Sequence, residues 1–192
     1  VAQPITTRPE LGKLDDKRIV YVGTGKYLEE SDLLSTDQQS LYAISDPDPL
    51  SYLDEPRGSL MVKQIMTNAG QSRTVTSLPV DLTVKRGWYV DYPDLGERQA
   101  IDDRLESSTL ISATVVPKNT VCAPGGYGWL NYFNYKTGGA VDASAVSGVQ
   151  TSSPIVGLNI FYLKKGGTNE LTPIPSIVKA NDPTPQVMGT VP

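Results

Sequence analysis

The sequence predicts an all-β protein. Val, Thr, Ile and aromatic residues gather in short runs that are bounded by Gly, Pro, Asn and Asp, which is typical of strands joined by turns. The 17 Gly and 15 Pro among 192 residues indicate many turns without reaching the content of a disordered chain. Helical patterning is weak. Together these observations favour many short strands that pair mostly antiparallel.

In chain order, we expect strands at residues 18–24, 40–45, 60–66, 73–84, 87–92, 109–116, 128–135 and 155–163. Each of these runs is rich in β-branched or aromatic residues and ends near a turn-forming residue. Two segments, 98–105 and 31–39, have the composition of short helices. Neither is long enough to organise the fold.

A repeated pattern points to the architecture. Residues 40–46 and 129–138 each read as an apolar strand that runs into a polar turn. The first leucines of the two segments, Leu41 and Leu130, are 89 residues apart in the sequence. This separation is about twice the ~40–45 residues of a four-stranded propeller blade. The order of the strands in residues 4–46 is similar to a blade of the quinoprotein-type β-propellers.

The length then predicts a partial β-propeller. A single unit of residues 1–192 holds about three four-stranded blades, at 1–66, 67–139 and 150–192, whereas closure takes at least four. A blade cannot cover both of its own faces, so we expect open edges that pair with the rest of a propeller or with another copy. A β-sandwich of the same strands is the alternative fold.

Composition excludes several function classes. Without His, the chain cannot form a Ser-His-Asp triad, a Cys-His pair or a His-ligated zinc site. A net charge of −4 with scattered Lys and Arg argues against nucleic acid as a partner. Apolar runs are too short to span a membrane. Cys122 is the single cysteine, expected as a buried thiol, and the start at Val1 suggests a piece of a longer protein.

Five stretches carry a resemblance to a known family: residues 3–11, 18–28, 38–46, 87–93 with 96–98, and 122–129. The most specific part is Gly-Trp-Tyr-Val-Asp from Gly87, then Gly-Glu-Arg from Gly96 and Cys-x-x-Gly-Gly from Cys122. These motifs resemble the C-terminal propeller domain of PilY/PilC-type proteins of type IV pili.

The resemblance implies a non-enzymatic structural and adhesion module of a pilus tip and biogenesis protein. Such a protein is exported to the cell surface, at the pilus tip or associated with the outer membrane. The implied partners are minor pilins or the pilus tip complex, and a host or abiotic surface.

Two features of some family members are missing. No calcium loop of the EF-hand type is present, because Asp46, Asp48, Asp54 and Glu55 are interrupted by prolines and lack the turn glycine. We therefore expect no metal and no cofactor in this chain, although the parent protein could bind calcium. An Arg-Gly-Asp tripeptide is also absent, since Ser59 follows Arg57 and Gly58.

One segment supports an alternative function. Trp88, Asp91, Tyr92 and Glu97 place aromatic rings beside carboxylates, as carbohydrate-binding or carbohydrate-active β-domains do. In a strand, however, Trp88, Val90 and Tyr92 share one face, which is also the pattern of a half-buried strand. These four residues are the candidate partner or glycan surface, with no catalytic residue assigned. We expect the neighbouring pair Asp102 and Asp103 to be solvated.

Overall fold

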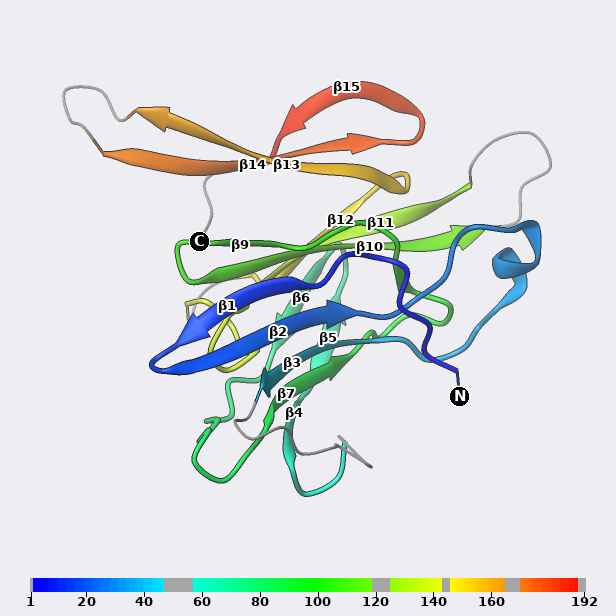
Figure 1. Ribbon diagram of the computed structural model, residues 1–192. Coiled ribbons are helices and arrows are strands. Elements are labelled where there is room, and N and C mark those ends of the chain that lie inside the picture. Colours follow the sequence, from blue (N-terminus) through cyan, green and yellow to red (C-terminus); the bar gives the residue numbers. More distant parts are fainter. Residues whose placement is uncertain (1, 47–56, 119–124, 143–145, 165–169, 190–192) are drawn as a thin grey trace.

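The computed structural model describes residues 2–46, 57–118, 125–142, 146–164 and 170–189. The described chain contains three β-sheets and one short 3-10 helix. In Figure 1 the third sheet lies at the top and the first towards the bottom, and the sheets do not close into a ring. The expectation of an all-β, open, mostly antiparallel structure is confirmed.

The first sheet contains β1 (Glu10–Leu14), β2 (Lys17–Gly23), β3 (Ser40–Asp46), β7 (Gly87–Asp91) and β4 (Met61–Gln64), in that order. All neighbours are antiparallel except β4 and β7, which pair parallel. The helix η1 (Glu30–Leu34) lies in the connection between β2 and β3.

The second sheet has the order β5 (Met66–Ala69), β6 (Ser72–Val75), β12 (Gly148–Thr151), β11 (Gly125–Asn134), β10 (Thr109–Lys118) and β8 (Arg98–Gln99). A further strand, β9 (Arg104–Glu106), pairs with another part of β10. The third sheet consists of β13 (Ile155–Lys164), β14 (Leu171–Lys179) and β15 (Asp182–Val187).

The sheets differ from three blades of four consecutive strands. They have five, seven and three strands. β7, which lies in the middle of the expected second blade, pairs with β3 of the first sheet. The expected strand 60–66 divides at Ile65, so that β4 and β5 belong to different sheets. Which strands pair depends on long-range register, and blade spacing in the sequence does not encode it.

The prediction of a short helix at residues 98–105 is wrong. Arg98 and Gln99 pair with Val115 and Thr114 of β10, and β9 pairs with the beginning of the same strand. Residues such as Arg, Gln and Ala favour helix locally, but pairing with a long buried strand outweighs that weak preference. The expected helical turn at 31–39 is present in part as η1.

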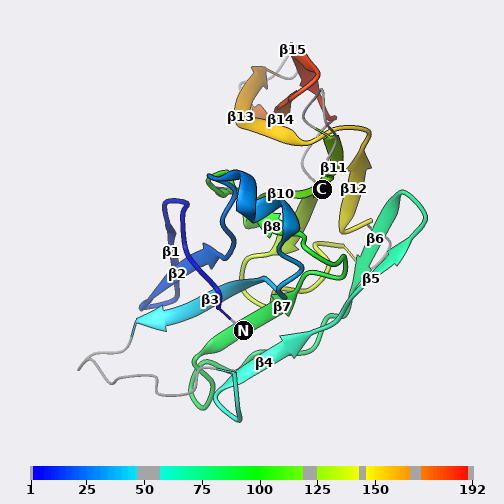
Figure 2. The same cartoon turned by 90° about the vertical axis from the view of Figure 1, so that its right-hand side faces the viewer.

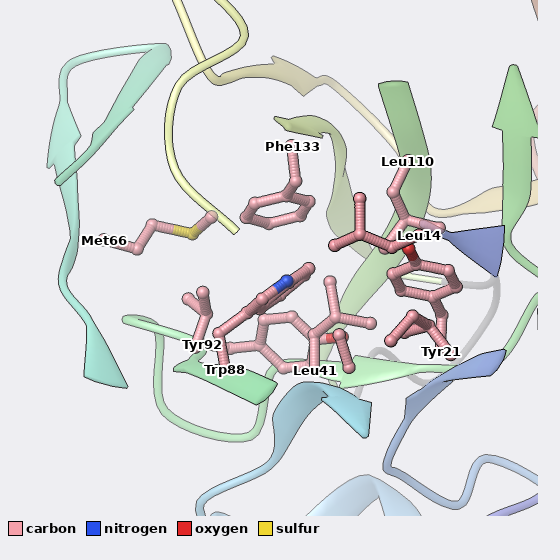
Figure 3. Close-up of a cluster of buried hydrophobic side chains, with 11 residues drawn as sticks. Leu14, Tyr21, Leu41, Met66, Trp88, Tyr92, Leu110 and Phe133 are labelled. Carbon is pink, nitrogen blue, oxygen red and sulfur yellow. The ribbon is translucent and has the colours of Figure 1, made fainter. Parts of the chain in front are cut away.

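The main core lies between the first and second sheets. Trp88 and Val90 of β7 and Leu41 of β3 meet Leu110 and Phe133 of β10 and β11 there (Figure 3). The Trp88 and Phe133 rings lie 6.0 Å apart, and Tyr21 approaches Trp88 at 6.3 Å.

A second core joins the second sheet to the third. Ile155 and Leu158 of β13 and Ile177 of β14 pack with Ile111 and Leu130. Each sheet thus buries a face against the next, which is the physical reason for stacking sheets in series.

Glycine is required where Trp88 enters the core. Gly138 has φ +69, and a Cβ at this position would lie 2.3 Å from the Trp88 ring. The turn after β11 can therefore cross the indole only without a side chain.

Candidate interaction surface

The four residues singled out in the sequence fall into different environments. Trp88 and Tyr92 are each 1% exposed and face the main core. The Trp88 indole N–H donates to the Tyr135 carbonyl (3.2 Å), and the Tyr92 hydroxyl donates to Gln99 Oε1 (2.9 Å). Because a sugar must reach a ring face in order to stack on it, these two rings offer no glycan surface. The half-buried strand pattern explains them instead.

Asp91 lies on the opposite face of the first sheet, where it is partly exposed. Its carboxylate accepts from Lys63 Nζ (2.7 Å), Arg57 Nη1 (2.9 Å) and the Ser40 hydroxyl (2.6 Å). Burial alone would raise the pKa of Asp91, but the Lys63 and Ser40 hydrogen bonds and the Arg57 charge hold it below its ordinary value. Asp91 thus binds Arg57, Lys63 and Ser40 in one cluster on this face of the sheet.

Two tyrosines lie beneath the cations of this cluster. The rings of Tyr42 and Tyr89 are stacked 5.9 Å apart, and the Arg57 guanidinium lies 4.9 Å from the Tyr89 centroid. Arg57 Nε also donates to the Tyr42 hydroxyl (2.6 Å). The arginine that precedes Gly58 and Ser59 is therefore engaged within the chain.

Glu97 is completely buried in an ion pair. Its carboxylate takes two hydrogen bonds from the Arg73 guanidinium, at 2.7 Å and 2.5 Å, and one from the Thr114 hydroxyl. Burial raises the pKa of Glu97, and this is opposed by the paired arginine and the threonine hydrogen bond. Glu97 joins β6 to the loop before β8, so its role is structural and it presents no acid to a ligand.

Asp94 completes this network at its outer side. It accepts from the Trp129 indole (2.9 Å), the Tyr127 hydroxyl (3.1 Å) and Asn68 (2.6 Å). Arg73 lies 3.7 Å from the centroid of the Trp129 ring, a close cation–π contact. Glu97 of the Gly-Glu-Arg motif and Trp129 of the stretch 122–129 thus meet at Arg73, a buried arginine that sequence reasoning did not single out.

Arg98, the last residue of the Gly-Glu-Arg motif, binds backbone carbonyls. Its guanidinium donates to the carbonyl oxygens of Gly96 (2.8 Å), Lys26 (3.0 Å), Asp32 (2.5 Å) and Ser35 (2.7 Å). Burial lowers the pKa of Arg98, while Asp32 opposes that shift. The side chain ties the β7–β8 loop to the segment around η1, beside a cavity of about 180 Å³.

Asp103 is buried, contrary to the expectation of a solvated pair. Burial raises the pKa of its carboxyl to about 7, although Gln99 and Ser112 hydrogen-bond to it. Its Oδ1 finds no hydrogen-bond partner among the described residues. Asp102, by contrast, is partly exposed and accepts from the Arg8 backbone N–H (2.9 Å). Only the fold distinguishes these two neighbours.

Cys122 and the acidic residues Asp48, Asp54 and Glu55 lie outside the described residues. Within the described ranges, no group of three or more His, Cys, Asp or Glu side chains is arranged to hold a metal ion. No helix in the same part of the chain has the length and apolarity needed to cross a membrane.

The sequence was compared with those of known proteins. No family model matches the chain. Two proteins of Xylella fastidiosa, each named a type IV pilus biogenesis factor PilY1 homolog, are similar to it. One is 33% identical over 132 residues, which is 64% of this chain and 9% of that protein. The other is 27% identical over 182 residues, which is 79% of this chain and 14% of that protein.

A solved structure covers almost the whole chain. The crystal structure of the Pseudomonas aeruginosa PilY1 C-terminal domain matches 97% of it with a TM-score of 0.68 and 22% identity, over 45% of that chain. The likeness therefore extends beyond the motifs to the arrangement of the sheets. This chain is a relative of the PilY1-type proteins and has the fold of a PilY1 C-terminal domain.

Proposed function

We propose that this chain is part of a non-enzymatic module of a type IV pilus biogenesis factor, and that it acts through contacts with other proteins. The observation that carries the proposal is the 33% identity to a relative of that name, in a chain whose fold matches a PilY1 C-terminal domain. The location that goes with this role is outside the cell, on the pilus or the cell surface.

The chemistry of the described polar residues agrees with a binding role. Asp91, Glu97 and Arg98 are all engaged in pairs or carbonyl contacts that hold loops in place. Side chains committed in this way stabilise a scaffold and position its surface, as adhesion modules require.

Minor pilins are the proposed partners. The test is to immobilise purified minor pilins and to measure binding of the purified chain by biolayer interferometry, with an unrelated β-propeller as control. We expect saturable binding by the folded chain and none by the control. A folded chain that binds no minor pilin would overturn the partner proposal.

The open sheets are proposed to pair with further β-structure. The chain corresponds to 45% of the solved PilY1 chain, which supports additional strands beside these sheets in a complete domain. In isolation, strand edges such as β1 and β4 then favour self-association. Light scattering should show dimers or larger species at high concentration, and a monodisperse monomer would contradict this.

A further inference from the structure

Three leucines with unusually exposed side chains surround the carbonyl contacts of Arg98. Leu28, Leu34 and Leu95 are 73%, 72% and 80% exposed. Leu34 adjoins Ser35 and Leu95 adjoins Gly96, and Arg98 binds the carbonyls of both neighbours. Leu28 lies two residues after Lys26, whose carbonyl oxygen also accepts from Arg98. Segments distant in sequence thus place the backbone beside each of the three leucines around one guanidinium.

Figure 2 looks onto this side of the molecule, where the short blue helix η1 lies in front of β8. The distance between segments is short at Gly96, where a Cβ would lie 2.8 Å from the Ser35 carbonyl oxygen. We name Leu28, Leu34 and Leu95 the leucine surface.

The backbone that carries the leucine surface is held by several hydrogen bonds. Besides the Arg98 contacts, the buried Asp32 carboxylate accepts from the N–H groups of Leu28 (2.8 Å) and Glu29 (3.0 Å). These hydrogen bonds lower the pKa of Asp32. A backbone that is already hydrogen-bonded in this way has little conformational freedom left to lose on binding, which favours association.

The segment that carries Leu28 and Leu34 has a negative net charge. Between residues 26 and 37, the four carboxylates of Glu29, Glu30, Asp32 and Asp37 accompany a single lysine, Lys26. The side chains of Glu29, Glu30 and Asp37 are exposed, whereas the neighbouring cation Arg98 is buried. Apolar residues with an acidic border complement a partner that carries apolar residues beside Lys or Arg.

We propose that the leucine surface docks an amphipathic segment of a partner protein whose apolar residues are flanked by Lys or Arg. This deepens the proposed function, on which it rests for the partner being a pilus protein. The apolar residues supply the buried area, and the acidic border selects the sign of the partner's charge and orients it.

The experiment uses two synthetic amphipathic helical peptides with the same leucine pattern, one with Lys and one with Glu at the polar positions. Binding to the purified chain is measured by fluorescence anisotropy. We expect the Leu/Lys peptide to bind in a salt-dependent manner and the Leu/Glu peptide to bind at least roughly tenfold more weakly.

Variants locate the binding. The triple variant Leu28→Ser, Leu34→Ser and Leu95→Ser should raise the Kd of the Leu/Lys peptide roughly tenfold or more. Leu11→Ser on β1 is the matched control, because Leu11 is 70% exposed and lies outside this region. Glu30→Gln should weaken binding, whereas Asp16→Asn, a fully exposed carboxylate elsewhere, should not.

Unchanged peptide binding by a folded triple variant would overturn the proposal, and so would an equal loss in the Leu11→Ser control. Circular dichroism and urea unfolding establish that each variant is folded. The outcome is separable from that of the proposed function. If the chain and its triple variant bind minor pilins equally, the function stands and the leucine surface fails. Leucine-dependent peptide binding without pilin binding supports the surface and contradicts the pilin partner.

Discussion

Arg73 and Glu97 form an ion pair in which both side chains are completely buried, with Arg73 Nη2 and Glu97 Oε2 2.5 Å apart. The pair connects β6 of the second sheet to the loop that leaves the first sheet after β7. It therefore fixes the position of Asp94, Glu97 and Arg98 relative to both sheets.

Glu97→Gln should destabilise the chain by about 3–5 kcal/mol, because it leaves the Arg73 charge buried with weaker compensation. The double variant Arg73→Met with Glu97→Leu should cost less than the Glu97→Gln change alone, since both charges are then removed. Urea unfolding measures both. Asp16→Ala at the exposed Lys13–Asp16 pair is the control and should change stability by less than about 1 kcal/mol. Equal effects at the two pairs would contradict the prediction.

Asp103 should make stability fall as pH rises. Burial raises the pKa of its carboxyl to about 7 in the folded chain, against 3.8 for an aspartate exposed to water. Between these values the folded chain keeps a proton that the unfolded chain loses, so stability decreases from about pH 4 to pH 7, by a few kcal/mol in total.

Asp103→Asn removes this part of the pH dependence. The difference in urea midpoint between pH 5 and pH 8 should be smaller in the variant than in the parent chain. Asp16→Asn, at an exposed position, serves as the control. Parallel pH profiles for the parent and the Asp103→Asn variant would show that this carboxyl does not titrate as described.

Gly138→Ala should destabilise the chain more than Gly70→Ala. Both glycines have a similar positive φ, +69 and +66, so the backbone cost of about 1–2 kcal/mol is shared. A Cβ at Gly138 meets the Trp88 ring, whereas at Gly70 nothing lies within 4 Å. The excess in the free energy of unfolding measures the overlap with the indole. Equal values would show that the turn moves away freely.

Arg98→Lys should loosen the segment around η1. A lysine ammonium cannot reproduce the planar fork that reaches four carbonyl oxygens, so at least one buried carbonyl is left unpaired, at a cost of about 1–3 kcal/mol. Hydrogen exchange of residues 28–35 should become faster. Arg104→Lys is the control, since Arg104 Nη1 donates to the Asp103 carbonyl (3.0 Å) at a partly exposed site. Unchanged exchange in Arg98→Lys would show that the carbonyl contacts do not hold this segment.

Trp88→Ala should cost about 3–5 kcal/mol, because the side chain is 1% exposed in the main core. A second variant, Trp88→Phe, keeps an aromatic ring in the core and tests the carbohydrate alternative. If a glycan array shows binding that is lost in a folded Trp88→Phe variant, the buried position of this ring in the chain would be contradicted.

Much of the candidate site was predictable locally, and its connections were not. The alternation along residues 88–92 correctly separated Trp88 and Val90 from Tyr89 and Asp91, because side chains of a strand point to opposite faces with a period of two. Nothing in that pattern reveals Arg73 as the partner of Glu97, since the two residues meet through strand pairings far apart in sequence.

The sequence by itself determined the all-β class, most of the strands of the first and second sheets, and the resemblance to PilY/PilC-type domains. These follow from residue type and short-range order, which the chain carries locally. The tertiary structure alone decided that β7 joins the first sheet, that β8 and β9 form where a helix was expected, and that Asp103 is buried while Asp102 is not. Each of these depends on which distant strand supplies hydrogen bonds and excludes water, and that free energy arises only when the sheets pack together.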